Sequence, residues 1–119
     1  MPRLSIVDTA LNSAPVFPSC NGIAMQLEIP QKFRRNSHMV KEAGYDESAK
    51  EIIGLMAERL GVADFSQTNI LDVGCGTRFS AYMINHCVPV KSYTGIDVNG
   101  EIISFLQAEA SPLSARFRY

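Results

Sequence analysis

The fold is decided by residues 69–77, NILDVGCGT, together with residues 95–98, GIDV. Each stretch is a short apolar run that reaches a carboxylate, Asp72 in the first and Asp97 in the second. Glycines 74 and 76 follow the first carboxylate, and a helical pattern comes next. Glycine lets a ligand approach the backbone where a Cβ would clash. The sequence therefore predicts a nucleotide-binding strand-turn-helix-strand unit, whose second carboxylate accepts hydrogen bonds from ribose hydroxyls.

Apolar periodicity on both sides of this unit predicts the remaining elements. Asp46 is the expected N-cap of the first helix and Gly61 its stop, while Asn99 is well placed to cap the last helix. We expect a helix over 46–60, a polar connection over 64–68, a strand over 69–73, a helix over 79–87, a strand over 92–97, a helix over 100–110 and a strand beginning at 115. This alternation predicts an α/β fold, a Rossmann-like doubly wound parallel sheet with right-handed crossovers.

The length of 119 residues limits how much of such a fold is present. We expect a sheet truncated after the start of its third strand, and hence the N-terminal piece of a longer protein. The strand over 69–73, central in a complete sheet, would then lie at an open edge. We divide the chain into an N-terminal extension, residues 1–44, and the N-terminal half of a cofactor-binding domain, residues 45–119.

These motifs resemble those of the class I S-adenosylmethionine-dependent methyltransferases. Residues 70–77, ILDVGCGT, are similar to the first motif of that family, and residues 95–98 to the end of its second strand. The resemblance implies methyl transfer from S-adenosylmethionine to a small-molecule acceptor. It also implies that Asp72 lies near the amino group of the cofactor, that Asp97 binds the ribose and that Val98 lines the adenine. The implied cofactor-binding residues are Asp72, Gly74, Cys75, Gly76, Asp97 and Val98.

Two residues distinguish this turn from related ones. Arg78 stands where the family commonly has a third glycine, and Phe79 where a dinucleotide-binding turn would have one. The charge of Asp72 would also be unfavourable beside a pyrophosphate, whereas it suits an ammonium group. The residues therefore favour S-adenosylmethionine over NAD. An NAD-type oxidoreductase half and a truncated, non-catalytic domain stay open as alternatives.

Composition limits the classes of partner. A net charge of −1 gives no electrostatic argument for nucleic acid, and no apolar run is long enough to span a bilayer. The three cysteines include no C-x-x-C pair, which favours reduced thiols and a cytoplasmic protein. We interpret Cys75 as a small residue packed beneath the glycine turn. His38 and His86 have no metal-ligand spacing, so we expect no metal site.

The segment ahead of the first helix offers two weaker candidates. Lys32, Arg34, Arg35 and Lys41 form a basic cluster, which is either a solvated face or a contact for an acidic substrate or partner. Tyr45 is a candidate lid residue, because related methyltransferases often carry a segment that lies over the cofactor. The catalytic base, the methyl acceptor and the oligomeric state have no signal in this sequence.

Overall fold

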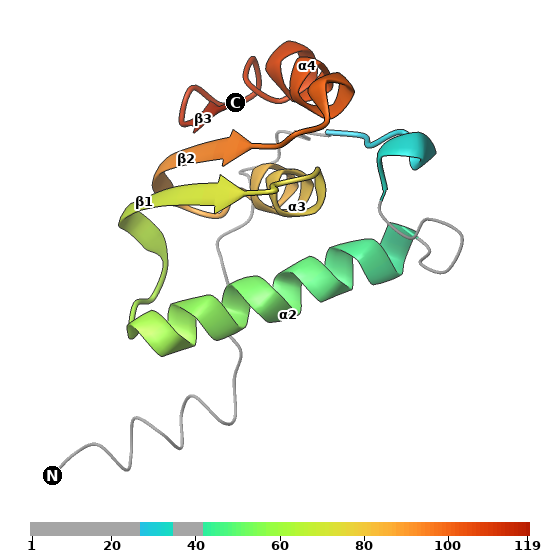
Figure 1. Cartoon of the computed structure of the whole chain (residues 1–119). Helices are drawn as coiled ribbons and strands as arrows, with labels where there is room; N and C mark the ends of the chain where they lie inside the picture. The colour runs from blue at the N-terminus through green and yellow to red at the C-terminus, as the bar shows by residue number, and fades with distance from the viewer. Residues whose placement is uncertain (1–26, 35–41) are drawn as a thin grey trace, which may run out of the picture.

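The computed structural model describes residues 27–34 and 42–119, with the backbone alone for 42–45. The elements are η1 (Gln31–Phe33), α2 (Glu42–Leu60), β1 (Phe65–Val73), α3 (Arg78–Asn85), β2 (Val90–Ile96), α4 (Gly100–Glu109) and β3 (Phe117–Arg118). The strands form a parallel sheet in the order β1-β2-β3 (Figure 1). The expected alternation of helices and strands and the parallel pairing are therefore confirmed, in a small α/β fold that is compatible with part of a Rossmann-like domain.

Of the three predicted helix-end residues, Gly61 and Asn99 are confirmed, whereas the prediction for Asp46 is wrong. Gly61, at a φ of 68°, ends α2, and the amide of Val62 donates to the carbonyl of Ala57 at 3.0 Å, as in a Schellman motif. The side chain of Asn99 caps α4 by accepting hydrogen bonds from two backbone amides. Asp46 is not an N-cap, because α2 begins at Glu42.

Strand β1 is longer than its sequence pattern indicated. Residues 65–68, expected in a polar connection, belong to the strand, since Phe65 pairs with Val90 and is 1% exposed. An irregularity in the register between Phe65 and Asn69 separates this part from the rest of the strand. Within the described sheet β1 pairs with β2 alone, which confirms that the strand lies at an edge.

The side chains on the two faces of the sheet differ in burial. Tyr93 and Phe117 point to one face, where both are buried and their rings lie 5.0 Å apart between centroids. The alternation of side chains along a strand places Leu71, Val73 and Ile96 on the opposite face, where each is exposed. The hydrophobic core therefore lies on the Tyr93 face, which also packs against α3 through the hydrogen bond between Tyr119 and Ser80.

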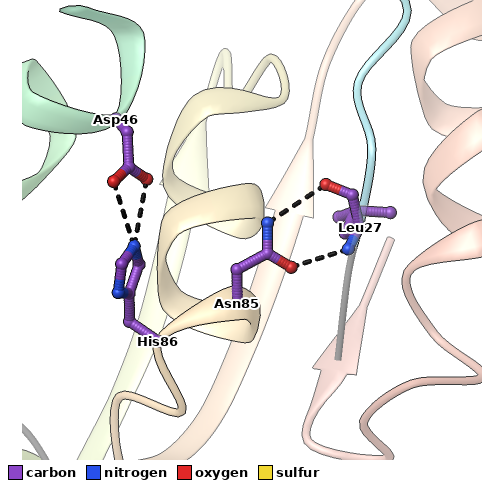
Figure 2. A network of polar contacts seen from close by, with 4 residues as sticks. All are labelled: Leu27, Asp46, Asn85 and His86. Carbon is purple, nitrogen blue, oxygen red and sulfur yellow. Dashed lines mark hydrogen bonds and ion pairs between the residues drawn. The ribbon is translucent and has the colours of Figure 1, made fainter. Parts of the chain in front are cut away.

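Polar contacts hold the first described residues and α2 against α3 (Figure 2). The side-chain amide of Asn85 binds the backbone of Leu27 twice, accepting from its N–H at 2.6 Å and donating to its carbonyl at 3.1 Å. On the other side of α3, the imidazole Nε2 of His86 lies 3.0 Å from a carboxylate oxygen of Asp46. Leu27 and Ile29 are buried in the core. The chain ahead of η1 is thus fixed at a defined point of α3.

Candidate functional site

A cavity of about 430 Å³ lies at the carboxyl ends of β1 and β2. This is where ligands bind in open parallel α/β sheets. In Figure 1 the cyan segment around η1 lies on the side toward which the arrows of β1 and β2 point. The cavity is lined by Lys32, Phe33, Arg34, Ser48, Gly74, Cys75, Gly76, Thr77, Arg78, Phe79, Asp97, Val98, Asn99 and Ile102. Five of the six predicted cofactor-binding residues are in this set; the exception is Asp72.

The glycine turn lines the cavity and is hydrogen-bonded to the end of β2. Gly74 and Gly76 have φ angles of 73° and 52°, in the left-handed region that favours glycine. The amides of Gly74 and Cys75 both donate to the carbonyl of Ile96, at 2.8 and 3.0 Å. Apart from each glycine and its two chain neighbours, no heavy atom lies within 4 Å of where a Cβ on either glycine would be. The turn is therefore fixed to β2 by hydrogen bonds, while the space beside its two glycines is open.

Asp97 links this turn to the start of α4. One carboxylate oxygen accepts from the amide of Gly76 at 2.9 Å, and the other accepts from the amide of Asn99 at 2.9 Å. Val98, next along the chain, is fully exposed at the cavity. Asp97 thus organises the loop, and its oxygens also lie at the cavity.

Asp72 lies on the other side of the turn, away from the cavity. Its carboxylate accepts a hydrogen bond from the hydroxyl of Tyr93 at 2.5 Å. Tyr93 is 1% exposed, and burial is the largest cause that raises the pKa of its hydroxyl, followed by the hydrogen bond to Asp72. Asp72 therefore faces the core side of the sheet, and its placement beside a cofactor amino group stays a prediction.

Cys75 packs beneath the turn against Gly95 of β2. A Cβ on Gly95 would lie 2.8 Å from the Cys75 sulfur and 2.9 Å from the Tyr119 ring, so a larger residue would force these side chains to shift. Burial, and then the charges of Asp72 and Asp97, raise the pKa of the Cys75 thiol to about 11. A thiol with so high a pKa is a poor nucleophile at neutral pH, which agrees with a packing role.

The cysteine prediction fails at Cys87. This residue is disulfide-bonded, whereas Cys75 is free and buried. The expectation of reduced thiols throughout is therefore wrong, and the cysteines no longer support a cytoplasmic setting. Cys20 lies outside the described residues.

A short segment ahead of α2 lines the cavity, and the sequence identified only its Lys32 and Arg34, as a solvated face or a contact for an acidic substrate or partner. We call residues 31–34 the strap. The hydroxyl of Thr77, at the start of α3, donates to the carbonyl of Phe33 at 3.0 Å. The ring of Phe33 lies 5.3 Å from that of Phe105 in α4, and the ammonium group of Lys32 lies 3.6 Å from Glu101. The strap is thus held at α3 and at α4, and it brings Lys32 and Arg34 to the cavity.

Arg78, the departure from the family pattern, is turned toward α2. Its guanidinium donates to the hydroxyl of Ser48 at 3.2 Å and lies 4.9 Å from the centre of the Phe79 ring. The side chain still lines the cavity, so its charge contributes to the potential there. Arg35, Lys41 and the Tyr45 side chain lie outside the described parts of the structure.

No family model, curated protein or solved structure matches the chain in the three comparisons with known proteins. In the described ranges, 27–34 and 42–119, no group of three or more His, Cys, Asp or Glu side chains could hold a metal ion. None of the helices within those ranges has the length and apolar character needed to cross a membrane.

Proposed function

We propose that this chain binds S-adenosylmethionine in the cavity at the ends of β1 and β2, and that it forms the cofactor-binding part of a methyltransferase. The acceptor is a small molecule. The observation that carries this proposal is the meeting of the open glycine turn with Asp97 at one cavity. The cofactor supplies an electrophilic methyl group on a positively charged sulfur. Residues of this chain bind and orient it, and such positioning contributes roughly 7–11 kcal/mol in well-aligned reactions.

The residues at the cavity fit the nucleoside part of that cofactor. Asp97 would accept hydrogen bonds from the ribose hydroxyls, while Val98 and Ile102 would contact the adenine from the start of α4. Gly74 and Gly76 would let the sulfonium and methionine part lie against the backbone, since no neighbouring side chain fills that space. The volume of about 430 Å³ lies within the range of roughly 300–1,000 Å³ found for small-molecule sites.

A second candidate, an NAD-type nucleotide, gains support from two observations. Asp72 is bonded to Tyr93 and does not line the cavity, so its charge is no argument against a pyrophosphate. Lys32, Arg34 and Arg78 line the cavity, and all three are cations. The bulk of Phe79 at the cavity stands against this candidate, because a dinucleotide-binding turn needs a glycine there.

Thermal unfolding with each ligand separates the two candidates. S-adenosylhomocysteine at a hundredfold excess over its dissociation constant should raise the free energy of unfolding by about 2.7 kcal/mol. NADH at the same concentration should leave the transition unchanged. Stabilisation by NADH alone would replace the methyltransferase proposal with the oxidoreductase one. A cooperative transition that neither ligand moves would overturn both.

The chain offers a matched pair of variants for this experiment. Gly76 and Gly61 both have a positive φ and open space around the missing Cβ, but only Gly76 lines the cavity. Alanine at either position should destabilise the fold by about 1–2 kcal/mol, because the left-handed conformation is strained for a residue with a Cβ. Only Gly76→Ala should also weaken the binding of S-adenosylhomocysteine. Equal binding by both variants would contradict a site at the turn.

A further inference from the structure

The charges around the cavity are unequal. Lys32, Arg34 and Arg78 bring three positive charges to its lining, and Asp97 brings the one negative charge among the lining residues. Glu101 lies just outside and pairs with Lys32. The whole chain, by contrast, carries a net charge of −1. The excess of positive charge is therefore local to this cavity rather than a property of the protein surface.

The positions of these cations differ in how firmly the fold fixes them. Arg78 is held by Ser48 and by the Phe79 ring, on the side of the cavity next to α2. Lys32 is exposed, and its pair with Glu101 is exposed as well, so solvent and salt screen it. Arg34 is half-buried, and its backbone amide donates to the carbonyl of Gln31 at 3.0 Å. Since Thr77 anchors the adjacent Phe33, Arg34 is the strap cation whose backbone is best fixed.

We propose that Arg34 and Arg78, which both line the cavity, form an anion subsite that takes a carboxylate or phosphate group of the bound ligand. The planar guanidinium presents paired N–H donors that match both groups, which a lysine does not. Gly74, Gly76 and Asp97 line the same cavity, and the strap meets the end of the glycine turn where Thr77 donates to the carbonyl of Phe33. The anion has two chemical sources: the amino-acid carboxylate of the cofactor and an acidic methyl acceptor. The choice between these two sources rests on the proposed function, whereas the presence of an anion subsite does not.

Calorimetric titrations of the whole chain and its Arg34→Gln variant test the subsite. The probes are S-adenosylhomocysteine, 5′-methylthioadenosine, which lacks the amino-acid group, and inorganic phosphate with and without saturating S-adenosylhomocysteine. Arg34→Gln should weaken the binding of the anionic probe about tenfold to hundredfold, as expected for a charge-assisted contact. Arg34→Lys should recover part of this loss. Arg59→Gln removes the same charge at an exposed position of α2 outside the cavity, and this control should keep the wild-type affinities.

The pattern of losses identifies the source of the anion. A loss for S-adenosylhomocysteine but not for 5′-methylthioadenosine assigns the subsite to the cofactor carboxylate. An unchanged S-adenosylhomocysteine affinity with weaker phosphate binding in its presence assigns the subsite to an acidic acceptor. If the wild-type chain binds phosphate through Arg34 but no S-adenosylhomocysteine, the subsite stands and the proposed function fails. Equal affinities of wild type and Arg34→Gln for every probe overturn the subsite.

Discussion

The ends of β1 and β2 each carry an aspartate, and the two side chains have opposite surroundings. Asp72 is paired with Gly95 in the sheet and points to the core, where the Tyr93 hydroxyl binds it. Asp97 comes one residue after β2 ends and binds two backbone amides at the cavity. Within a strand, alternation decides which face a side chain takes. A residue just past the end of a strand is free of that constraint. Asp72 and Asp97 therefore have different surroundings, although both come at the end of a strand motif.

The largest expected effect comes from removing the carboxylate at the cavity. Asp97→Ala deletes the acceptor of the Gly76 and Asn99 amides and, in the proposed function, that of the ribose hydroxyls. Hydrogen bonds to a charged group contribute about 1.5–3 kcal/mol each. The affinity for S-adenosylhomocysteine, measured by calorimetry, should fall at least tenfold. Asp72→Ala should change this affinity far less, and an equal loss in both variants would contradict the difference between the two aspartates.

The second prediction concerns the core-facing aspartate. Tyr93→Phe removes the hydroxyl that binds the Asp72 carboxylate and should lower the free energy of unfolding in urea by about 1–3 kcal/mol. Tyr119→Phe is the matched control, since its hydroxyl binds the uncharged Ser80 side chain at 2.7 Å. A bond between neutral groups contributes about 1 kcal/mol, so this loss should be smaller. A larger loss for Tyr119→Phe would contradict the expectation that the hydrogen bond to the charged Asp72 is the stronger of the two.

The smallest expected effect concerns a thiol that both aspartates influence. The pKa of Cys75 is raised from 9.0 to about 11, by burial first, then by Asp72 and Asp97. Between these two values the unfolded chain has lost the thiol proton and the folded chain keeps it. The unfolded state therefore binds fewer protons, and the free energy of unfolding should fall as the pH rises from about 9 to 11. Cys75→Ala should flatten this part of the profile.

The same thiol ranks the two carboxylates directly. The rate of alkylation at residue 75, followed by peptide mapping across pH, reports the thiolate fraction. Asp72→Asn should move this profile to lower pH further than Asp97→Asn does, because Asp72 is the stronger of the two charges acting on the thiol. The reverse order would place Asp97 nearer the sulfur than the structure does.

The sequence predicted those features that depend on short-range signals. Gly61 and Asn99 act through a left-handed φ and a side-chain cap, both local to a helix end. Gly74 and Gly76 likewise form a turn whose shape depends on their own backbone angles. Asp97 reaches the cavity because it follows directly on β2. Each of these predictions needed only neighbouring residues.

The features that were missed depend on contacts between distant residues. The strap meets α3 through Phe33 and Thr77, which are 44 residues apart, and no periodicity in residues 31–45 indicated that contact. The sequence also did not predict to which face of the sheet the Asp72 side chain points. Its neighbours Ile70, Leu71 and Val73 are all apolar, so no alternation of polar and apolar residues marks a polar face of β1 there. Asp46 was taken as an N-cap on composition, whereas its carboxylate lies against His86 of the neighbouring helix.

The two hydrogen bonds between Asn85 and Leu27 fix the register of the chain that follows (Figure 2). The side-chain amide of Asn85 binds both the N–H and the carbonyl of Leu27, as a neighbouring strand would. Leu27 is therefore the residue at which the chain is held against α3. Leu27 and Ile29 then point inward in alternation, and the strap begins two residues after Ile29. One residue inserted between Asn85's contact and the strap would displace the Phe33 carbonyl from Thr77 and move Arg34 relative to the glycine turn. Asn85 does not line the cavity, yet its contact with Leu27 contributes to the position of the strap there.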